Sequence, residues 1–530
     1  MFDIVFKNGK VVDGTGNPWY RADVGIRGNY IQSIRPEINE DAYSTIDISD
    51  LYISPGFIDT HSHSDLMLLK ESQRPEKIRQ GVTTEVLGQD GTAPAPVPGT
   101  HKAFWKDYNK GLNGKLESDW PFSTMGEYLN ALEGQTNTNV LSLVPHGALR
   151  LQTVGLDNRE ATSEELNSMS NLLAKSMEEG GIGLSTGLIY TPCTFAPTIE
   201  LKRLCSTVSR KGGIFVVHMR NEGSWIFKAL SEVIEVGKET GVPVHISHLG
   251  AQSKKVWGKG DRIVETILEA REEGVDATCD QYPYTAGSTL LSALIPPWVF
   301  EKHSENLREA LKDQDTREKI LDFLEEHTVE EWDSHFHRVG ADNIYISSVS
   351  SEANKQLQGR PLPEAAEMRN EGIFETVLNI LIEEDMEASM VVFLCQEEDV
   401  ETIMKSKFQM FCTDGLLGGF PHPRVYGSFP RVLRKYVQEE EVLELEQAIR
   451  KMTSLPANRL SLSTRGIVKE GFRADLTIFD INEVNDRATY EEPAKFPTGI
   501  RHVLVNGNFV VKDEQPTDSK PGKVIKIRNP

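Results

Sequence analysis

The sequence has 530 residues, of which 38% are hydrophobic and 26% are charged, and its formal net charge is −22. This length is too great for one small domain and fits either a large α/β barrel with an accessory domain or three average domains. The composition is that of an ordinary globular protein rather than a disordered one, and the negative charge argues against nucleic acid or anionic membranes as partners.

The sequence also predicts a reducing compartment. The five cysteines are odd in number and include no C-x-x-C pair, so a disulfide framework is not expected. The N-terminus lacks the basic and apolar regions of a signal peptide, and no apolar run has the length of a membrane span. We therefore expect a cytoplasmic protein.

Both ends of the chain are predicted to be rich in β-strands. Strand character is expected at residues 2–7, 10–12, 23–27 and 30–34, with a turn at Asn8-Gly9, and again at 474–480 and 502–511, with a turn at Asn506-Gly507. The similarity of the two ends predicts one small β-sandwich, built from residues 1–55 and 465–530.

Residues 56–464 alternate between strands and helices. The strands expected after residues 57–59 are 82–87, 140–144, 183–188, 214–217, 242–246, 276–280, 344–348, 390–393 and 409–412. Strands that alternate with helices form parallel βαβ units, and about eight repeats close a (β/α)8 TIM-like barrel. Charged helices interrupt this pattern at about 286–342, which we interpret as an insertion near the barrel mouth. The fold class is therefore predicted to be α/β.

The chain is organised around the segment SPGFIDTHSHSD at 54–65. His61 and His63 follow the short apolar strand 57–59, and side chains spaced i, i+2 in an extended segment lie on one face. Both imidazoles can therefore reach one divalent cation, and imidazole suits Zn²⁺. Because an isolated His-x-His pair is a weak signal, this interpretation requires further ligands at the ends of other strands.

Residues of the required kind occur throughout the barrel region. Barrel enzymes place their chemistry at the C-terminal ends of the strands. The polar residues at or just after such ends are His61, His63, Asp90, His146, His218, His248 and Asp414. One histidine at such a position is usually part of an ordinary hydrogen-bonded structure, whereas several at equivalent ends favour a metal site. Zn²⁺ lowers the pKa of bound water to about 7 and polarises a carbonyl, and Asp414 is the candidate to transfer the proton.

These motifs resemble those of the amidohydrolase superfamily and, within it, of the N-acyl-D-amino-acid deacylases (D-aminoacylases). The resembling segments include IRQGVTTEVLGQDG at 78–91, VVHMRNEG at 216–223, VHISHL at 244–249, DQYPYTAGSTLLSALIPPW at 280–298, TDG at 413–415 and HPRVYGSFPRVL at 422–433. The resemblance covers essentially the whole chain. It implies a (β/α)8 barrel, a β-sandwich from both termini and a mobile insertion near the mouth.

The resemblance also implies residue roles. Zn²⁺, as one or two ions, would be held by His218 and His248, with His61 and His63 forming a second or weaker position, Asp90 as a further ligand and Asp414 as the general base. Tyr190 and Tyr282 would lie beside the substrate, and in our own hypothesis the metal with Tyr282 or His146 stabilises the oxyanion. The residues expected to bind the substrate are Tyr190, Ser288, Arg424 and Lys254. A second His-x-His, His335-Phe336-His337, lies in the charged insertion and is interpreted as a surface or hinge feature.

Two positions depart from the family pattern. Asp90 stands where these deacylases usually have a cysteine, so a carboxylate replaces a bridging thiolate and leaves metal preference and number open. Gly250 stands where a lysine often follows the second metal histidine and suits a substrate carboxylate. Either that carboxylate is absent, or its partner is another cation, the candidates being Lys254, Lys255, Lys259 and Arg424.

The predicted function is hydrolysis of N-acyl-D-amino acids or similar small amides through a metal-bound water and an aspartate base. Cleavage of dipeptide or isoaspartyl bonds, of carbamoyl compounds or of cyclic amides are alternatives within the enzyme class. A non-catalytic binding protein on the same scaffold is the alternative from another class. The expected partner is a small N-acyl amino acid or related amide, and the oligomeric state is left open.

Overall fold

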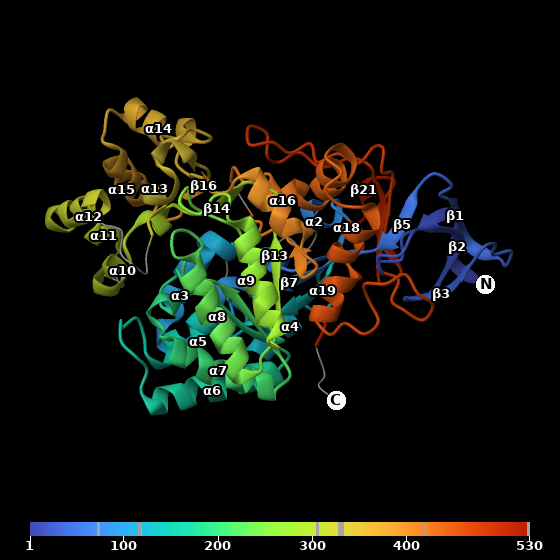
Figure 1. Cartoon of the computed structure of the whole chain (residues 1–530), viewed down its shortest axis with the longest axis horizontal. Coiled ribbons are helices and arrows are strands. Elements are labelled where there is room, and N and C mark those ends of the chain that lie inside the picture. The colour runs from blue at the N-terminus through green and yellow to red at the C-terminus, as the bar shows by residue number, and fades with distance from the viewer. Residues whose placement is uncertain are drawn as a thin grey trace.

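Figure 1 shows the protein as a computed structural model that describes residues 1–70, 75–114, 116, 119–303, 307–326, 333–417 and 419–526. A β-rich unit lies on the right of this view and a barrel with its surrounding helices on the lower left. The insertion projects at the upper left, where helices α10 to α15 gather. None of the described helices is both long and apolar enough to cross a membrane, and the five cysteines are free.

A closed barrel of parallel strands forms the centre of the molecule. Its strands are β6 (Phe57–Asp59), β7 (Val82–Leu87), β8 (Asn139–Ser142) continued by β9 (Val144–Pro145), β10 (Gly183–Gly187), β11 (Ile214–His218), β12 (Val244–Ile246), β13 (Ala277–Gln281) and β17 (Gln409–Phe411). A parallel bridge between Ser62 and Gly415, with a hydrogen bond from the Asp414 N–H to the His61 carbonyl, closes the ring. The predicted (β/α)8 barrel is confirmed.

Helices surround the barrel because each carries one apolar face. The outer helices include α5 (His146–Thr153), α6 (Ser163–Glu178), α7 (Thr198–Arg210), α8 (Ile226–Thr240), α9 (Gly260–Glu272), α16 (Glu397–Lys405) and α18 (Leu445–Met452). In α8, Leu230 and Val233 pack in the same core cluster as Phe215 of β11. Thr162 begins α6 with a capping box, and Gly241 ends α8 in the left-handed conformation that glycine adopts without strain.

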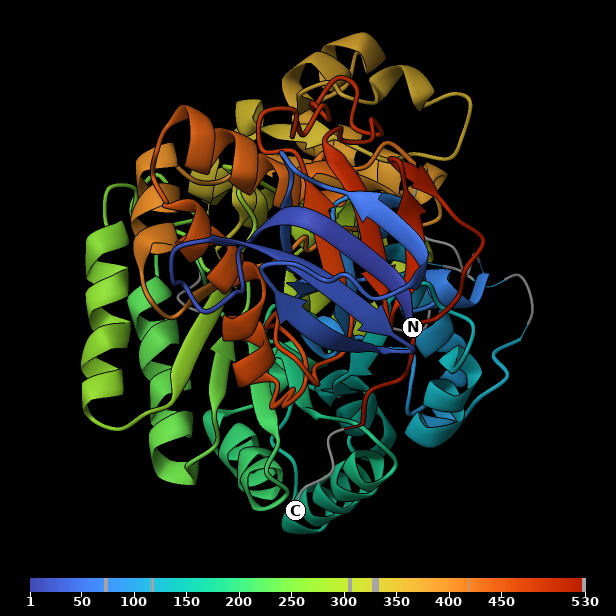
Figure 2. The same cartoon turned by 90° about the vertical axis from the view of Figure 1, so that its right-hand side faces the viewer.

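The two termini share one nine-stranded sheet, whose early and late strands lie side by side in Figure 2. Its N-terminal strands are β1 (Phe2–Val11), β2 (Tyr20–Arg27), β3 (Tyr30–Arg35), β4 (Ala42–Asp47) and β5 (Tyr52–Pro55). Its C-terminal strands are β18 (Leu476–Phe479), β19 (Ile500–Val505), β20 (Asn508–Lys512) and β21 (Gln515–Pro516). The two sets join where β5 pairs antiparallel with β18.

This sheet folds over on itself. The rings of Phe6 in β1 and Phe509 in β20 have centroids 6.2 Å apart, although β5, β18 and β19 lie between these strands in the sheet order. A flat sheet would separate them by about 19 Å, at about 4.8 Å per strand. The two halves therefore face each other across a shared core, which confirms the predicted sandwich from both termini.

The predicted turn at Asn8-Gly9 is wrong. Strand β1 continues through both residues, and its register against β2 shifts between Phe6 and Gly9. Asn8 has a φ of 63°, a conformation that asparagine tolerates better than most residues. The Asn-Gly pair thus forms a bulge, which uses the same backbone conformations as a hairpin turn.

The insertion has its own sheet and its own core. Strands β14 (Ala286–Leu290), β16 (Ser389–Phe393) and β15 (Ile344–Ile346) pair antiparallel in that order. The strands expected at 344–348 and 390–393 therefore do not belong to the barrel, because an apolar segment does not specify its pairing partner. The helices of the insertion are α10 (Pro297–His303), α11 (Leu307–Ala310), α12 (Gln314–Glu326), α13 (His335–Val339), α14 (Leu362–Arg369) and α15 (Ile373–Glu383).

We propose that the insertion runs from residue 286 to about 394 rather than ending near 342. Residues between these limits form one apolar cluster that joins Leu291, Ile344, Leu378 and Met390. The predicted boundaries of the other units, at residues 55 and 464, stay predictions.

Candidate metal centre

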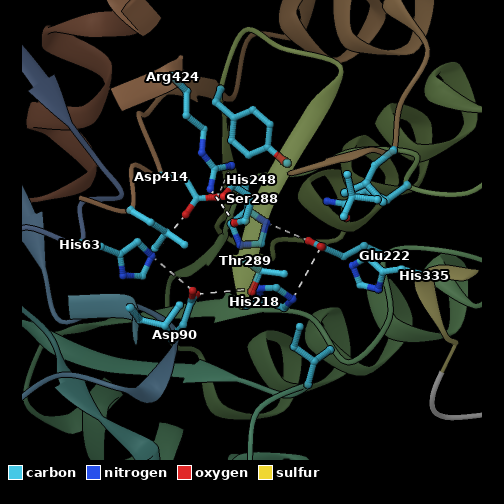
Figure 3. A pocket seen from close by; sticks show the side chains of 18 of the residues that line it. His63, Asp90, His218, Glu222, His248, Ser288, Thr289, His335, Asp414 and Arg424 are labelled. Carbon is cyan, nitrogen blue, oxygen red and sulfur yellow. Dashed lines mark hydrogen bonds and ion pairs between the residues drawn. The ribbon is translucent and has the colours of Figure 1, made fainter. Parts of the chain in front are cut away.

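Five predicted ligands meet at the C-terminal ends of the barrel strands, and Figure 3 shows His63, Asp90, His218 and His248 around one pocket. His61 and His63 follow β6, Asp90 follows β7, His218 ends β11 and His248 follows β12. Two groups, His61–His63–Asp90 and Asp90–His218–His248, each have ligand atoms within 4.8 Å of one another. Asp90 belongs to both groups, so its carboxylate lies between two pairs of imidazoles.

The imidazoles and carboxylates approach each other closely. The Nε2 atoms of His61 and His63 are 3.2 Å apart, and Asp90 Oδ2 lies 3.6 and 3.5 Å from them. Asp414 Oδ1 lies 3.6 and 3.3 Å from the same two nitrogens. On the other side, His218 Nδ1 is 3.9 Å from Asp90 Oδ1. One cation could therefore reach several of these atoms with small adjustments.

The backbone is strained at three residues of this cluster. Asp90, His248 and Asp414 have φ values of 55°, 33° and 46°, which lie in a region that residues other than glycine rarely adopt. Such conformations cost about 1–3 kcal/mol each and cluster at functional sites. The His248 N–H donates to Asp280 Oδ1 at 2.6 Å, and this hydrogen bond helps to hold the backbone of His248 in its strained conformation.

The donor set fits a divalent cation. His63 and Asp90 are at most 3% exposed, yet Asp90 Oδ1 and His218 Nδ1, which face each other, have no hydrogen-bond partner among the described residues. Leaving a buried polar atom unpaired costs about 1–3 kcal/mol. Imidazole nitrogens with carboxylate oxygens are the ligands that Zn²⁺ accepts.

The electrostatics of the cluster also favour a cation. Burial on its own would raise the pKa of Asp414, but Arg424 and His61 hold it well below its ordinary value. Burial would lower the pKa of His248, yet Glu222 and Asp414 raise it to about 10. The first shift keeps the Asp414 carboxylate ionised, and the second reflects the carboxylates around His248, so both favour positive charge at this position.

Asp414 is oriented by its neighbours. Arg424 Nη1 lies 2.9 Å from Asp414 Oδ2, while Asp414 Oδ1 faces His61 and His63. Arg424 also donates from Nη2 to the Ser288 carbonyl at 2.9 Å and stacks 4.4 Å from the centre of the Tyr282 ring. The carboxylate therefore keeps one oxygen directed at the histidines.

The same pocket contains most of the predicted substrate-binding residues. Tyr190, Tyr282, Ser288, Arg424 and Asp414 all line it. The Tyr190 hydroxyl shares a hydrogen bond with Thr289 Oγ1 at 3.1 Å, and its ring centre is 5.4 Å from that of His218. Apolar side chains of Leu112, Ile189 and Leu416 complete part of the wall.

Two predicted residues lie elsewhere. The ring nitrogens of His146 bond Thr186 Oγ1 at 2.9 Å and Glu200 Oε1 at 2.8 Å, and His146 does not line the pocket. It stands just after β9, as a site residue would, but its side chain points toward α7. Lys254 is exposed and does not line the pocket either. The structure therefore does not bring either residue to the pocket with the other predicted site residues.

Glu222, His335 and Arg338 also line the pocket, although the sequence did not predict them as site residues. Glu222 Oε1 lies 3.1 Å from His248 Nδ1, and its Oε2 lies 3.7 Å from His218 Nε2. Its position four residues after His218 was the available signal. His335, expected on the surface or at a hinge, is only 8% exposed. The highly charged sequence around it concealed that burial.

Comparison with known proteins agrees with this geometry. Residues 44–511 match the amidohydrolase family. The D-aminoacylase of Alcaligenes xylosoxydans xylosoxydans is 33% identical over 99% of this chain and 97% of its own length. The N-acyl-D-glutamate deacylase of the same organism is 34% identical over 99% and 96%.

A solved structure agrees as well. The crystal structure of N-acyl-D-glutamate deacylase from Bordetella bronchiseptica, complexed with zinc and a phosphonate inhibitor that mimics the tetrahedral intermediate, is 31% identical. It superposes with a TM-score of 0.83 over 99% of this chain and 100% of that one. The chain therefore belongs to the amidohydrolase family, alongside the D-aminoacylases and N-acyl-D-amino-acid deacylases.

Proposed function

We propose that the protein is a zinc-dependent deacylase that hydrolyses the amide bond of N-acyl-D-amino acids. The observation that carries this proposal is the convergence of His63, Asp90, His218, His248 and Asp414 at one pocket, with His61 directly behind them in contact with Asp90 and Asp414. The activities of the D-aminoacylase and N-acyl-D-glutamate deacylase relatives, and the zinc of the Bordetella structure, support it. We retain a cytoplasmic location as a prediction.

The chain's own residues supply the proton transfer. Zinc, when bound by the histidines and Asp90, polarises the substrate carbonyl and lowers the pKa of water at the site. Asp414 is ionised and directs Oδ1 toward that position, so it accepts the proton of the attacking water and returns it to the leaving nitrogen. Arg424 holds the other oxygen of Asp414 and so fixes the orientation of the base.

Tyr282 is placed to stabilise negative charge on the substrate oxygen. Its ring lines the pocket beside Arg424, and its side chain is buried. Burial raises the pKa of the Tyr282 hydroxyl well above its ordinary value, against the opposing effect of Arg424. The hydroxyl therefore stays protonated and can donate a hydrogen bond to a developing oxyanion.

A substrate panel tests this function. The zinc-loaded protein should hydrolyse N-acetyl-D-amino acids faster than their L-enantiomers, dipeptides, isoaspartyl peptides, carbamoyl amino acids and cyclic amides. Asp414→Asn should reduce kcat by about 10²–10⁴-fold, the usual contribution of a positioned base. Faster turnover of a cyclic or carbamoyl substrate than of every N-acyl-D-amino acid would favour a different amidohydrolase activity instead.

A further inference from the structure

The insertion places the positively charged side chain of Arg338 in the pocket. Ser334 caps the N-terminus of the short helix α13, which carries His335 and Arg338, and both of these residues line the pocket. The segment is docked firmly on the barrel. Asp333 Oδ2 accepts the Ser224 N–H at 2.9 Å, and the Arg338 carbonyl accepts the Lys254 N–H at 3.0 Å.

A glycine permits this close approach. Gly223 lies in the loop after β11, and a Cβ there would stand 2.8 Å from both Arg338 Nε and Asp333 Oδ2. Real Cβ contacts essentially never come so close, so a larger residue would displace the Arg338 side chain. Arg338 therefore reaches the pocket only because the barrel loop leaves room for it.

The guanidinium of Arg338 is buried without adequate partners. The side chain is 5% exposed, and its Nε has no hydrogen-bond partner among the described residues. Asp333 Oδ2, 3.7 Å away, is the one described carboxylate oxygen within 4.0 Å. A charge-assisted hydrogen bond would be about 2.7–2.9 Å long. Burying a charged donor without such bonds is costly, and a bound anion would remove that cost.

The other positively charged side chains near the site either contact acceptors already or lie outside the pocket. Arg424 already contacts Asp414 and the Ser288 carbonyl. Lys254, Lys255 and Lys259 are exposed and do not line the pocket. Of the two arginines that line the pocket, Arg424 lies 2.9 Å from a carboxylate oxygen, whereas Arg338 has none closer than 3.7 Å among the described residues.

We propose that Arg338 binds a carboxylate of the substrate and thereby determines which acylated amino acids the enzyme prefers. This inference rests on the proposed deacylase function. Guanidinium binds carboxylates in a bidentate manner, which suits recognition better than a single point charge does. The carboxylate has two possible sources in an N-acyl amino acid, namely the α-carboxylate or an acidic side chain.

Paired substrates distinguish these sources. One pair is N-acetyl-D-leucine and its carboxamide, which differ at the α-carboxylate. The other pair is N-acetyl-D-glutamate and N-acetyl-D-glutamine, which differ at the side chain. For each pair, kcat and KM, or the inhibition constant where a carboxamide is not turned over, are measured for wild type, Arg338→Met and Arg338→Lys. Lys319→Met, an equal charge change at an exposed site of the same insertion, serves as control.

Arg338→Met should reduce the preference for the carboxylate in one of the pairs by at least about tenfold, mainly through KM. Arg338→Lys should restore part of that preference, and Lys319→Met should leave it unchanged. The responding pair identifies which carboxylate Arg338 binds.

Equal losses of kcat/KM on all four compounds would show that Arg338 has a structural role. Unchanged substrate preferences in an Arg338→Met variant that unfolds at the wild-type temperature would show that Arg338 does not bind the carboxylate. If Arg338→Met does not fold, an unchanged preference in folded Arg338→Lys would overturn the proposal. A wild-type enzyme that hydrolyses no N-acyl amino acid would instead refute the proposed function itself, before any variant is compared.

Discussion

At the scale of single residues, carboxylates set the orientation of the metal-site histidines. Glu222 accepts from His248 Nδ1 and lies against His218 Nε2, which leaves His218 Nδ1 to face Asp90 Oδ1. Carboxylates that bond the distal nitrogen of a histidine fix its tautomer and strengthen it as a ligand. Glu222 is therefore a positioning residue rather than a ligand.

Replacing Glu222 by glutamine should weaken zinc binding by about 10–100-fold, because the amide provides a weaker partner for His248. Competition with a chelator of known affinity measures this change, and the His248 N–H resonance provides a second readout. Glu232→Gln, which removes a partly buried glutamate from an ion pair with Arg220, is the control. Unaltered zinc affinity in Glu222→Gln would mean that the carboxylate does not orient either histidine.

We expect His146 to contribute to stability rather than to the reaction, because it bonds Glu200 and does not line the pocket. Burial would lower its pKa, but Cys193 and Glu200 raise it to about 9. Because this value exceeds the unfolded value of 6.5, the stabilising effect is complete below pH 6.5 and is lost as pH rises through 9. The residue therefore favours the folded state most strongly in mildly acidic solution.

The difference in unfolding free energy between wild type and His146→Gln should shrink by about 3 kcal/mol from pH 6.5 to above pH 9. Urea unfolding across this range measures it. The variant should bind as much zinc as the wild type. A difference that stays constant with pH would exclude proton uptake by His146 as the source of stability.

At the scale of elements, a buried ion pair ties together the strands that carry the metal site. Asp59, at the end of β6, accepts the Thr413 N–H at 2.9 Å, the Thr413 hydroxyl at 2.7 Å and Lys77 Nζ at 2.6 Å. Lys77 lies in α2 (Pro75–Ile78), and Thr413 follows β17. The network therefore fixes the strand ends that position His61 and Asp414 relative to each other.

Lys77→Met should destabilise the protein by about 3–5 kcal/mol, because it leaves the charge of Asp59 buried and unpaired. Denaturant unfolding of the metal-free protein measures this loss separately from zinc binding. The double variant Asp59→Asn, Lys77→Met should lose less unfolding free energy than the two single variants lose in total. Strict additivity would indicate that the two side chains do not interact.

At the scale of the whole molecule, the sequence predicted what depends on local pattern and periodicity. Alternating strands and helices indicated the barrel, and the rule that barrel sites lie at strand ends identified His61, Asp90, His218 and His248 together. The similar β-rich ends indicated a shared sandwich. Each of these features follows from residues that are close together in the chain or from a repeated pattern.

Features that depend on side-chain orientation or on packing between distant segments could not be predicted in this way. His146 and His218 occupy equivalent places in the sequence pattern, but the side chain of His146 points to Glu200 and that of His218 points to the pocket. Strands β15 and β16 resemble barrel strands and pair elsewhere. Arg338 reaches the pocket only through the docking of the insertion on Gly223, which no local pattern reveals.

The histidines and Asp90 are expected to hold the zinc that the deacylation requires. We would remove metal with a chelator, add zinc stepwise, and measure both bound zinc by elemental analysis and hydrolysis of an N-acetyl-D-amino acid. Activity should be absent without metal and return as one or two zinc ions bind per chain, while His218→Ala should bind less zinc and recover little activity. Undiminished hydrolysis by the metal-free protein, or no zinc uptake at neutral pH, would show that these residues do not form a zinc centre for deacylation.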